Sequence, residues 1–155
     1  MGLLNIFSKR MKDVEDKYVF DKAKYHFESV EEAGLDLDQA YVHTGLFFAW
    51  LVNNGLVSDF FIEETSGEIA KLKERKISPS EIYKNWDGVL IGELLNKEGY
   101  NFALDYFDFE KGAYMGDYES LFCPGEESIF GVEDTWENYD RIKPAIDLAF
   151  SKWKK

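Results

Sequence analysis

The stretch Asp38-Gln-Ala-Tyr-Val-His-Thr-Gly-Leu-Phe-Phe-Ala-Trp-Leu-Val-Asn-Asn54 decides the fold of this chain. Val42, Leu46 and Trp50 recur at four-residue spacing along one helical face, and most positions beside that face are apolar too. A helix that is apolar almost all round has to be buried. The segment is therefore predicted to be the central helix of the core, with Gly55 providing a left-handed stop.

Capping signals predict further helices around this one. Ser78-Pro79-Ser80-Glu81 predicts a helix start, with Ser78 as the N-cap and Glu81 completing a capping box. Asp134, followed three residues later by Glu137, predicts the start of the last helix in the same way. Pro144 should kink or split that helix, because proline lacks a backbone donor. Apolar periodicity adds helices at about 58–76, 89–97 and 101–109.

The segment from 112 to 130 has weak periodicity, and its three glycines, Gly112, Gly116 and Gly125, are typical of turns. The sequence permits one small β-hairpin between residues 112 and 132 but does not require it. The predicted fold class is mainly α: a compact single-domain helical fold with an aromatic-rich core. We place the globular domain at 20–155 and an N-terminal amphipathic extension at 1–19, where Leu3, Leu4 and Phe7 precede a basic run.

The composition is that of an acidic globular protein. Eighteen basic and thirty acidic side chains give a net charge of −12 and a pI of about 4.6. This charge argues against nucleic acid and anionic membranes as direct partners and permits basic proteins. The apolar stretch from Gly45 to Val52 is too short to span a bilayer, and the start of the chain lacks a signal-peptide pattern. With Cys123 as the single cysteine, the predicted location is cytoplasmic.

One window concentrates this negative charge. Residues 105–140 hold eleven acids and one basic residue, Lys111, together with nine aromatic side chains. A second window, from 25 to 70, holds nine acids and neither lysine nor arginine. Carboxylates attract a basic partner over distance, and aromatic rings provide contact area after it arrives. The side chains predicted to bind a partner are Tyr114, Asp117, Tyr118, Glu119, Glu126 and Glu127.

The two histidines suggest a different site. His26 and His43 lie seventeen positions apart, which is not the spacing of a structural zinc site, so we expect neither a metal nor another cofactor. His43 is predicted to be a histidine hydrogen-bonded at the edge of the core. The alternative is a pocket in which His43 acts as acid or base, because histidine titrates near neutrality. The side chains of that alternative pocket are Tyr25, His26, His43, Trp50 and Trp86.

Known catalytic signatures are missing from the sequence. It has no phosphate-binding P-loop and no GxSxG, HExxH or CxxC motif. Pairs of neighbouring carboxylates such as Glu63 and Glu64 do not provide the spatial separation that a glycosidase needs. An enzymatic activity is therefore not the favoured interpretation.

Several strings in the chain carry a family resemblance. They are Tyr41-Val-His-Thr-Gly-Leu-Phe-Phe-Ala-Trp-Leu51, Trp86-Asp-Gly-Val-Leu90, Glu98-Gly-Tyr-Asn-Phe-Ala103, Asp117-Tyr118, Asp134-Thr-Trp-Glu-Asn-Tyr139 and Phe150-Ser-Lys-Trp-Lys154. Over about residues 20–154 the chain resembles a group of small uncharacterised bacterial proteins of unknown function. Such proteins are similar to the acidic partners found beside secreted toxins, so the resemblance implies an immunity role and carries over no catalytic residue.

Three hypotheses follow for the function. The first is a non-enzymatic acidic binding protein, an immunity-type inhibitor of a basic bacterial toxin domain. The second is a small enzyme or ligand-binding domain with its pocket around His26 and His43. The third is a homodimeric structural protein whose aromatic side chains meet at a two-fold interface.

Overall fold

The computed structural model describes residues 3–125 and 128–155, and its centre is α3 (Val42–Asn53). Every residue of α3 from Val42 to Val52 is buried, so the predicted central helix is confirmed. It begins later than expected, because residues Leu37–Tyr41 form a 3-10 turn, η2, before it. Asp36 caps that turn, with its side chain accepting a hydrogen bond from the backbone N–H of Asp38 at 2.9 Å.

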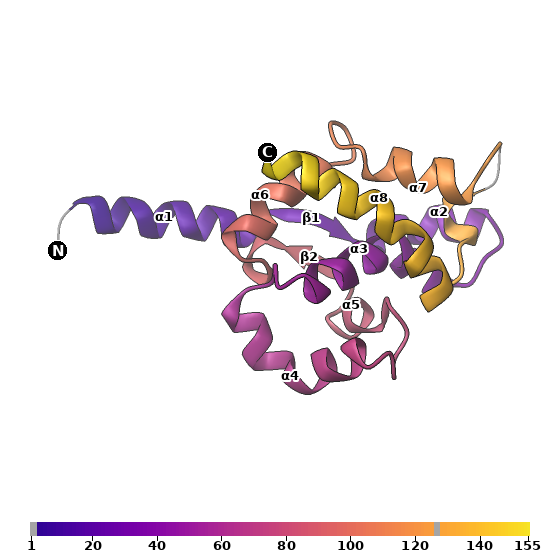
Figure 1. Ribbon diagram of the computed structural model, residues 1–155, viewed down its shortest axis with the longest axis horizontal. Coiled ribbons are helices and arrows are strands. Elements are labelled where there is room, and N and C mark those ends of the chain that lie inside the picture. Colours follow the sequence, from indigo (N-terminus) through magenta and orange to yellow (C-terminus); the bar gives the residue numbers. More distant parts are fainter. Residues whose placement is uncertain (1–2, 126–127) are drawn as a thin grey trace.

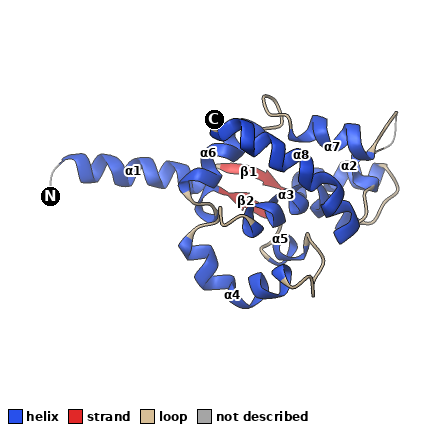
Figure 2. Cartoon of the chain, in the orientation of Figure 1, coloured by secondary structure: helices blue, strands red, loops and turns tan. Residues whose placement is uncertain are grey.

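Other helices surround α3 and leave only a small sheet (Figures 1 and 2). They are α2 (Phe27–Glu32), α4 (Asp59–Lys73), α5 (Glu81–Asn85), α6 (Lys97–Tyr106), α7 (Tyr114–Phe122) and α8 (Trp136–Lys154), with the short 3-10 turns η1 (Ala23–His26), η3 (Gly92–Leu94) and η4 (Ile129–Gly131). The prediction of a mainly α fold is confirmed. Among the described residues, no helix is both long and apolar enough to cross a membrane.

The sheet pairs two segments that lie far apart in the sequence. Strands β1 (Val19–Lys22) and β2 (Val89–Ile91) run antiparallel, with Asp21 opposite Leu90, and the register shifts between Val19 and Asp21. The hairpin that the sequence permitted between 112 and 132 is wrong for the residues described there. Residues 112–125 and 128–132 contain α7 and η4 but no strand, because Tyr114 and Tyr118 lie one helical turn apart and both pack into the core.

Aromatic rings fill the space between α3 and its neighbours, as predicted. Phe47 of α3 stacks on Phe107 with ring centroids 4.8 Å apart and also contacts Tyr114 of α7. Trp50, one turn further on, contacts Phe102 of α6 and Phe150 of α8. These rings are the reason that helices from both halves of the sequence enclose α3.

Helix α8 closes the core from outside. The indole N–H of Trp50 donates to Asp147 at 2.8 Å, and Asn53 donates to the hydroxyl of Tyr139 at 2.9 Å. The N-cap of α8 is Thr135 and not Asp134, since the Thr135 hydroxyl accepts from the backbone of the third helical residue. The helix continues through Pro144 as one element, so of the predicted kink or split the split does not occur.

The predicted capping box at 78–81 is also corrected. Helix α5 begins at Glu81, and its N-cap is Ser80 rather than Ser78. The carboxylate of Asp134 accepts from the backbone N–H of Ser80 at 2.9 Å. Asp134 therefore joins the starts of α5 and α8 instead of capping its own helix.

Helix α1 (Leu3–Lys17) extends away from the body of the molecule (Figure 1). Its C-terminal end reaches η3, where the backbone of Glu15 lies directly against Gly92. The apolar face that was predicted for the extension rests on Leu3, Leu4 and Phe7, whose side chains lie outside the described part of the chain. The following Tyr18 already packs on the body, with its ring centroid 4.9 Å from that of Phe20.

Candidate functional site

A buried polar cluster lies where β1, η1 and α3 meet. It consists of Asp21 from β1, His26 at the end of η1, and the consecutive residues His43 and Thr44 at the start of α3. Asp21, His43 and Thr44 are each no more than 1% exposed, whereas the side chain of His26 is 20% exposed. A fully buried carboxylate beside a fully buried imidazole requires a specific explanation, because burying a charge is costly unless it is paired.

Asp21 organises the cluster. Its Oδ1 accepts a hydrogen bond from Nε2 of His26 at 2.7 Å, and its Oδ2 accepts from the hydroxyl of Thr44 at 2.6 Å. Because an ionised carboxylate can only accept, Nε2 of His26 carries the proton in this arrangement. The Nε2 of His43 faces Oδ2 of Asp21 at 3.5 Å, which is too long for a good hydrogen bond.

His43 departs from its expected role. Within the described part of the chain neither of its ring nitrogens has a hydrogen-bond partner, although the residue is almost fully buried. The prediction that His43 is hydrogen-bonded at the edge of the core is therefore wrong. An unpaired buried polar group costs about 1–3 kcal/mol of stability, so such a group marks either a strained site or one that binds something.

The protonation states follow from burial and from the contacts. Burial alone would raise the pKa of Asp21, but the hydrogen bond from His26, the facing ring of His43 and the Thr44 hydroxyl hold that pKa well below its usual value. Burial lowers the pKa of His43, and the nearby Asp21 offsets this only in part. At neutral pH the cluster therefore combines an ionised carboxylate with a neutral imidazole.

Aromatic rings surround the two histidines. The rings of His26 and His43 meet edge to face with centroids 4.7 Å apart. Phe130 lies 5.8 Å from His26 and 5.7 Å from His43, and Phe109 lies 6.0 and 6.2 Å from them. Phe109 is 44% exposed, so the cluster lies near the surface under two phenyl rings, with His26 as its solvent-facing member.

The other members predicted for this pocket lie elsewhere. Trp50 is fully buried against α6 and α8, and Trp86 packs on Phe61 of α4 with ring centroids 5.1 Å apart. Tyr25 is 60% exposed. The structure thus brings together His26 and His43 and replaces the three aromatic residues with Asp21, Thr44 and two phenylalanines. The sequence contains no clear signal for Asp21, because β1 is only four residues long and its pairing partner is distant.

The predicted partner-binding residues divide into three groups. Tyr114 and Tyr118 are fully buried, so in this structure they offer no contact area to a partner; Tyr114 donates its hydroxyl proton to the carbonyl of His43 at 2.6 Å. Asp117 is half-buried and accepts a hydrogen bond from Tyr106 at 2.7 Å, and Glu119 is exposed. Glu126 and Glu127 lie outside the described residues. The binding role of these acids stays a prediction.

A groove of about 510 Å³ brings parts of the two acidic windows together. It is lined by Ala33, Leu35, Phe122, Ser128, Gly131, Val132, Glu133, Asn138 and Arg141. Gln39 of η2 joins its two sides, because its side-chain amide donates to the carbonyls of Phe130 and Val132 at 2.7 and 2.8 Å. The exposed acids Glu31 and Glu32 end α2 directly before the lining residue Ala33, and the exposed Glu133 lines the groove itself.

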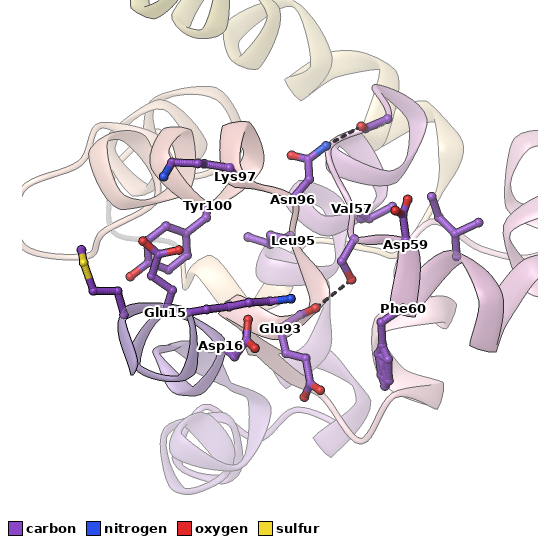
Figure 3. Close-up of a pocket in the computed structure, with 16 residues that line it drawn as sticks. Glu15, Asp16, Val57, Asp59, Phe60, Glu93, Leu95, Asn96, Lys97 and Tyr100 are labelled. Carbon is purple, nitrogen blue, oxygen red and sulfur yellow. Dashed lines mark hydrogen bonds between the residues drawn. The ribbon is translucent and has the colours of Figure 1, made fainter. Parts of the chain in front are cut away.

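A second cavity, of about 710 Å³, lies between the end of α1 and the segments around Ser58 and Asn96 (Figure 3). The Ser58 hydroxyl donates to the carbonyl of Glu93 at 2.7 Å, and the Asn96 side chain donates to the carbonyl of Gly55 at 2.9 Å. Its lining includes both carboxylates, such as Glu15 and Glu93, and the lysines Lys12 and Lys97. These side chains reach solvent, so the cavity is a mixed-charge groove without the buried, unpaired groups of the histidine cluster.

The comparisons with known proteins define the family and leave the activity open. Residues 19–132 match a family described as a domain of unknown function (DUF7832). The match spans more than half of the chain, which therefore belongs to this family; the expected relation to a domain of unknown function is confirmed. No curated protein and no solved structure matches the chain.

Proposed function

We propose that this chain is a non-enzymatic acidic binding protein of the bacterial cytoplasm, an immunity-type inhibitor that captures a basic toxin domain. The observation that carries the proposal is the groove beside α2, where residues from both acidic windows line one partly apolar surface. Leu35, Phe122 and Val132 supply that surface, Glu133 is the acid that lines it, and the exposed Glu31 and Glu32 directly precede the lining residue Ala33.

The charged and the apolar side chains of the groove would act on different steps of binding. The net charge of −12 speeds the encounter with a cationic partner. Rim charges contribute mainly to the association rate and its salt dependence, whereas an apolar anchor seated in the groove slows dissociation. Arg141, the basic residue that lines the same groove, is held by contacts within the protein. Its guanidinium lies 4.9 Å from the ring centroid of Phe122 and donates to the carbonyl of Leu121.

The test uses two charge reversals of equal size. Genes that neighbour this one would be expressed alone and together with it, to find a product that is toxic alone and rescued by this protein. In the Glu31→Lys/Glu32→Lys variant, on α2, we expect rescue to be lost and the association rate with the purified toxin to fall at least tenfold at low salt.

The Glu63→Lys/Glu64→Lys variant is the matched control, because these exposed neighbours on α4 change the net charge equally and lie away from the groove. It should retain rescue. Equal loss in both variants would mean that net charge alone matters, and the absence of any rescued toxin would remove the immunity proposal.

A second candidate is a ligand-binding or enzymatic pocket at the histidine cluster. The observation that favours it is the convergence of His26 and His43, with the ring nitrogens of His43 unpaired among the described residues. A neutral, buried imidazole next to a carboxylate can accept a proton from a bound molecule. Turnover of a small substrate that is lost in His43→Gln, in a protein that still folds, would support this function over the first.

A further inference from the structure

We propose that Asp21, His26 and His43 bind one divalent transition-metal ion, with zinc as the first candidate. The site would join β1, η1 and α3, and each residue would supply one ligand atom. This inference is independent of the partner-binding proposal, because it concerns the isolated protein. It revises the expectation, drawn from histidine spacing alone, that the chain binds no metal.

The donor atoms are already close to coordination geometry. One ligand atom from each of the three residues lies within 4.8 Å of the other two. Around a tetrahedral zinc ion with bonds of about 2.0–2.1 Å, neighbouring ligand atoms stand roughly 3.3 Å apart. The separation is 2.7 Å between His26 Nε2 and Asp21 Oδ1, and 3.5 Å between His43 Nε2 and Asp21 Oδ2. The widest separation among the three ligand atoms, at most 4.8 Å, exceeds the tetrahedral value by about 1.5 Å, so side-chain movements of that size at most would be needed.

His43 supplies the independent observation that points to a ligand. Its side chain is buried, its Nε2 faces the carboxylate of Asp21, and within the described chain that nitrogen has no hydrogen-bond partner. A metal ion would use the Nε2 lone pair and so give a partner to one of the two unpaired nitrogens of this ring. The other two ligands would change less, because the ion would take the place of the proton on Nε2 of His26, and that ring would carry its proton on Nδ1 instead.

The surroundings suit a metal centre. Ligand carboxylates in metal sites are usually oriented by a further hydrogen bond, and Thr44 donates one to Asp21 at 2.6 Å. Phe109 and Phe130 form the hydrophobic shell that limits solvent access. Two imidazoles and one carboxylate fit zinc and its transition-metal neighbours, whereas magnesium and calcium prefer ligand sets made of oxygen.

Three protein ligands have a chemical consequence. Structural zinc sites use four protein ligands, whereas catalytic sites use three and bind water or substrate at the remaining position. His26 is the ligand with solvent exposure, so a small molecule would approach from its side. The competing explanation is a cluster held by protein hydrogen bonds alone, which predicts no stoichiometric metal binding.

The experiment starts from purified full-length protein stripped with a chelator and then titrated with zinc chloride in a calorimeter. We expect saturable binding of one ion per chain and a raised melting temperature. Magnesium chloride at the same concentration should give neither effect. Cobalt(II) at the same site should give visible absorption bands that report its coordination.

Variants locate the ion. His26→Gln keeps an N–H for Asp21 and changes the most exposed ligand, so the fold should survive. It should weaken zinc binding by more than the roughly 10–100-fold that loss of a supporting residue costs. Thr44→Val, which removes only the hydrogen bond to Asp21, should weaken binding within that range. Glu28→Gln, an exposed acid on neighbouring α2, is the matched control and should bind zinc as the unchanged protein does.

Two results would overturn the proposal. One is a folded, stripped protein that takes up no zinc at one ion per chain. The other is unchanged affinity in a folded His26→Gln variant, which would place the ion elsewhere. Circular dichroism of every variant separates loss of metal from loss of fold, and neither result bears on whether the groove beside α2 binds a partner.

Discussion

Gly45 is the residue on which the approach of α3 to α5 depends. A methyl group built at this position would stand 2.8 Å from the Cα atom of Ser80, which belongs to the backbone and cannot rotate away. We predict that Gly45→Ala lowers the free energy of unfolding by about 1–3 kcal/mol, the usual cost of overpacking. Urea unfolding followed by tryptophan fluorescence measures this change.

Gly116 provides the matched comparison. It lies inside α7, is exposed, and has no atom within 4 Å of an added methyl group among the described residues. Since alanine is favoured over glycine inside a helix by up to about 1 kcal/mol, Gly116→Ala should leave the stability unchanged or raise it. If both variants lose stability equally, the contact with Ser80 is not the cause.

The histidine cluster could be predicted only in part from the sequence. His26 and His43 were singled out because histidines are rare in this chain, and the structure places their rings together. Asp21 was missed because its importance comes from burial and from pairing across β1 and β2, neither of which leaves a local pattern. Tyr114 and Tyr118 were assigned to the surface from composition, which does not distinguish an aromatic contact surface from an aromatic core.

At the scale of elements, the start of α8 rests on Thr135. Its hydroxyl accepts from the backbone N–H of Asn138 at 3.1 Å. Thr135→Ala should lower the free energy of unfolding by about 0.5–2 kcal/mol, because it leaves a donor at the helix start unpaired. Thr135→Ser keeps the hydroxyl and should cost much less. Thermal unfolding of both variants tests this, and an equal loss of stability would show that the cap is not responsible.

Long periodic elements could be predicted from the sequence, and short ones could not. Helix α3 could be predicted from its long apolar run and from Gly55 after it, which has a φ of 68°. Strands β1 and β2 contain four and three residues and are held by each other and by the surrounding helices. The predicted N-caps of α5 and α8 are wrong by two residues and one residue. Asp134 accepts from the backbone of Ser80, and Thr135 caps α8 in its place.

At the scale of the molecule, the residues that match the family and the residues that form the buried core do not cover the same part of the chain. The match ends at residue 132, yet α8, from Trp136 onward, contributes Tyr139, Ile142 and Ile146 to the buried core. The match begins at residue 19, and α1 before it extends away from the body (Figure 1). The two ends of the chain therefore differ in what they contribute to stability.

A pair of truncations tests this difference. Removing residues 1–17 deletes α1 but keeps Tyr18 on Phe20, so the fragment 18–155 should fold with a cooperative thermal transition close to that of the full chain. Removing residues 133–155 should prevent folding. The three buried side chains of α8 contribute about 1.5–3 kcal/mol each, and their loss approaches the entire 5–15 kcal/mol that stabilises a typical domain. It also uncovers Trp50, whose ring packs on Phe150 and whose indole N–H bonds Asp147. Circular dichroism and the cooperativity of melting distinguish the two fragments. A fragment 1–132 that melts cooperatively would show that the family segment is a complete folding unit and that α8 only covers it.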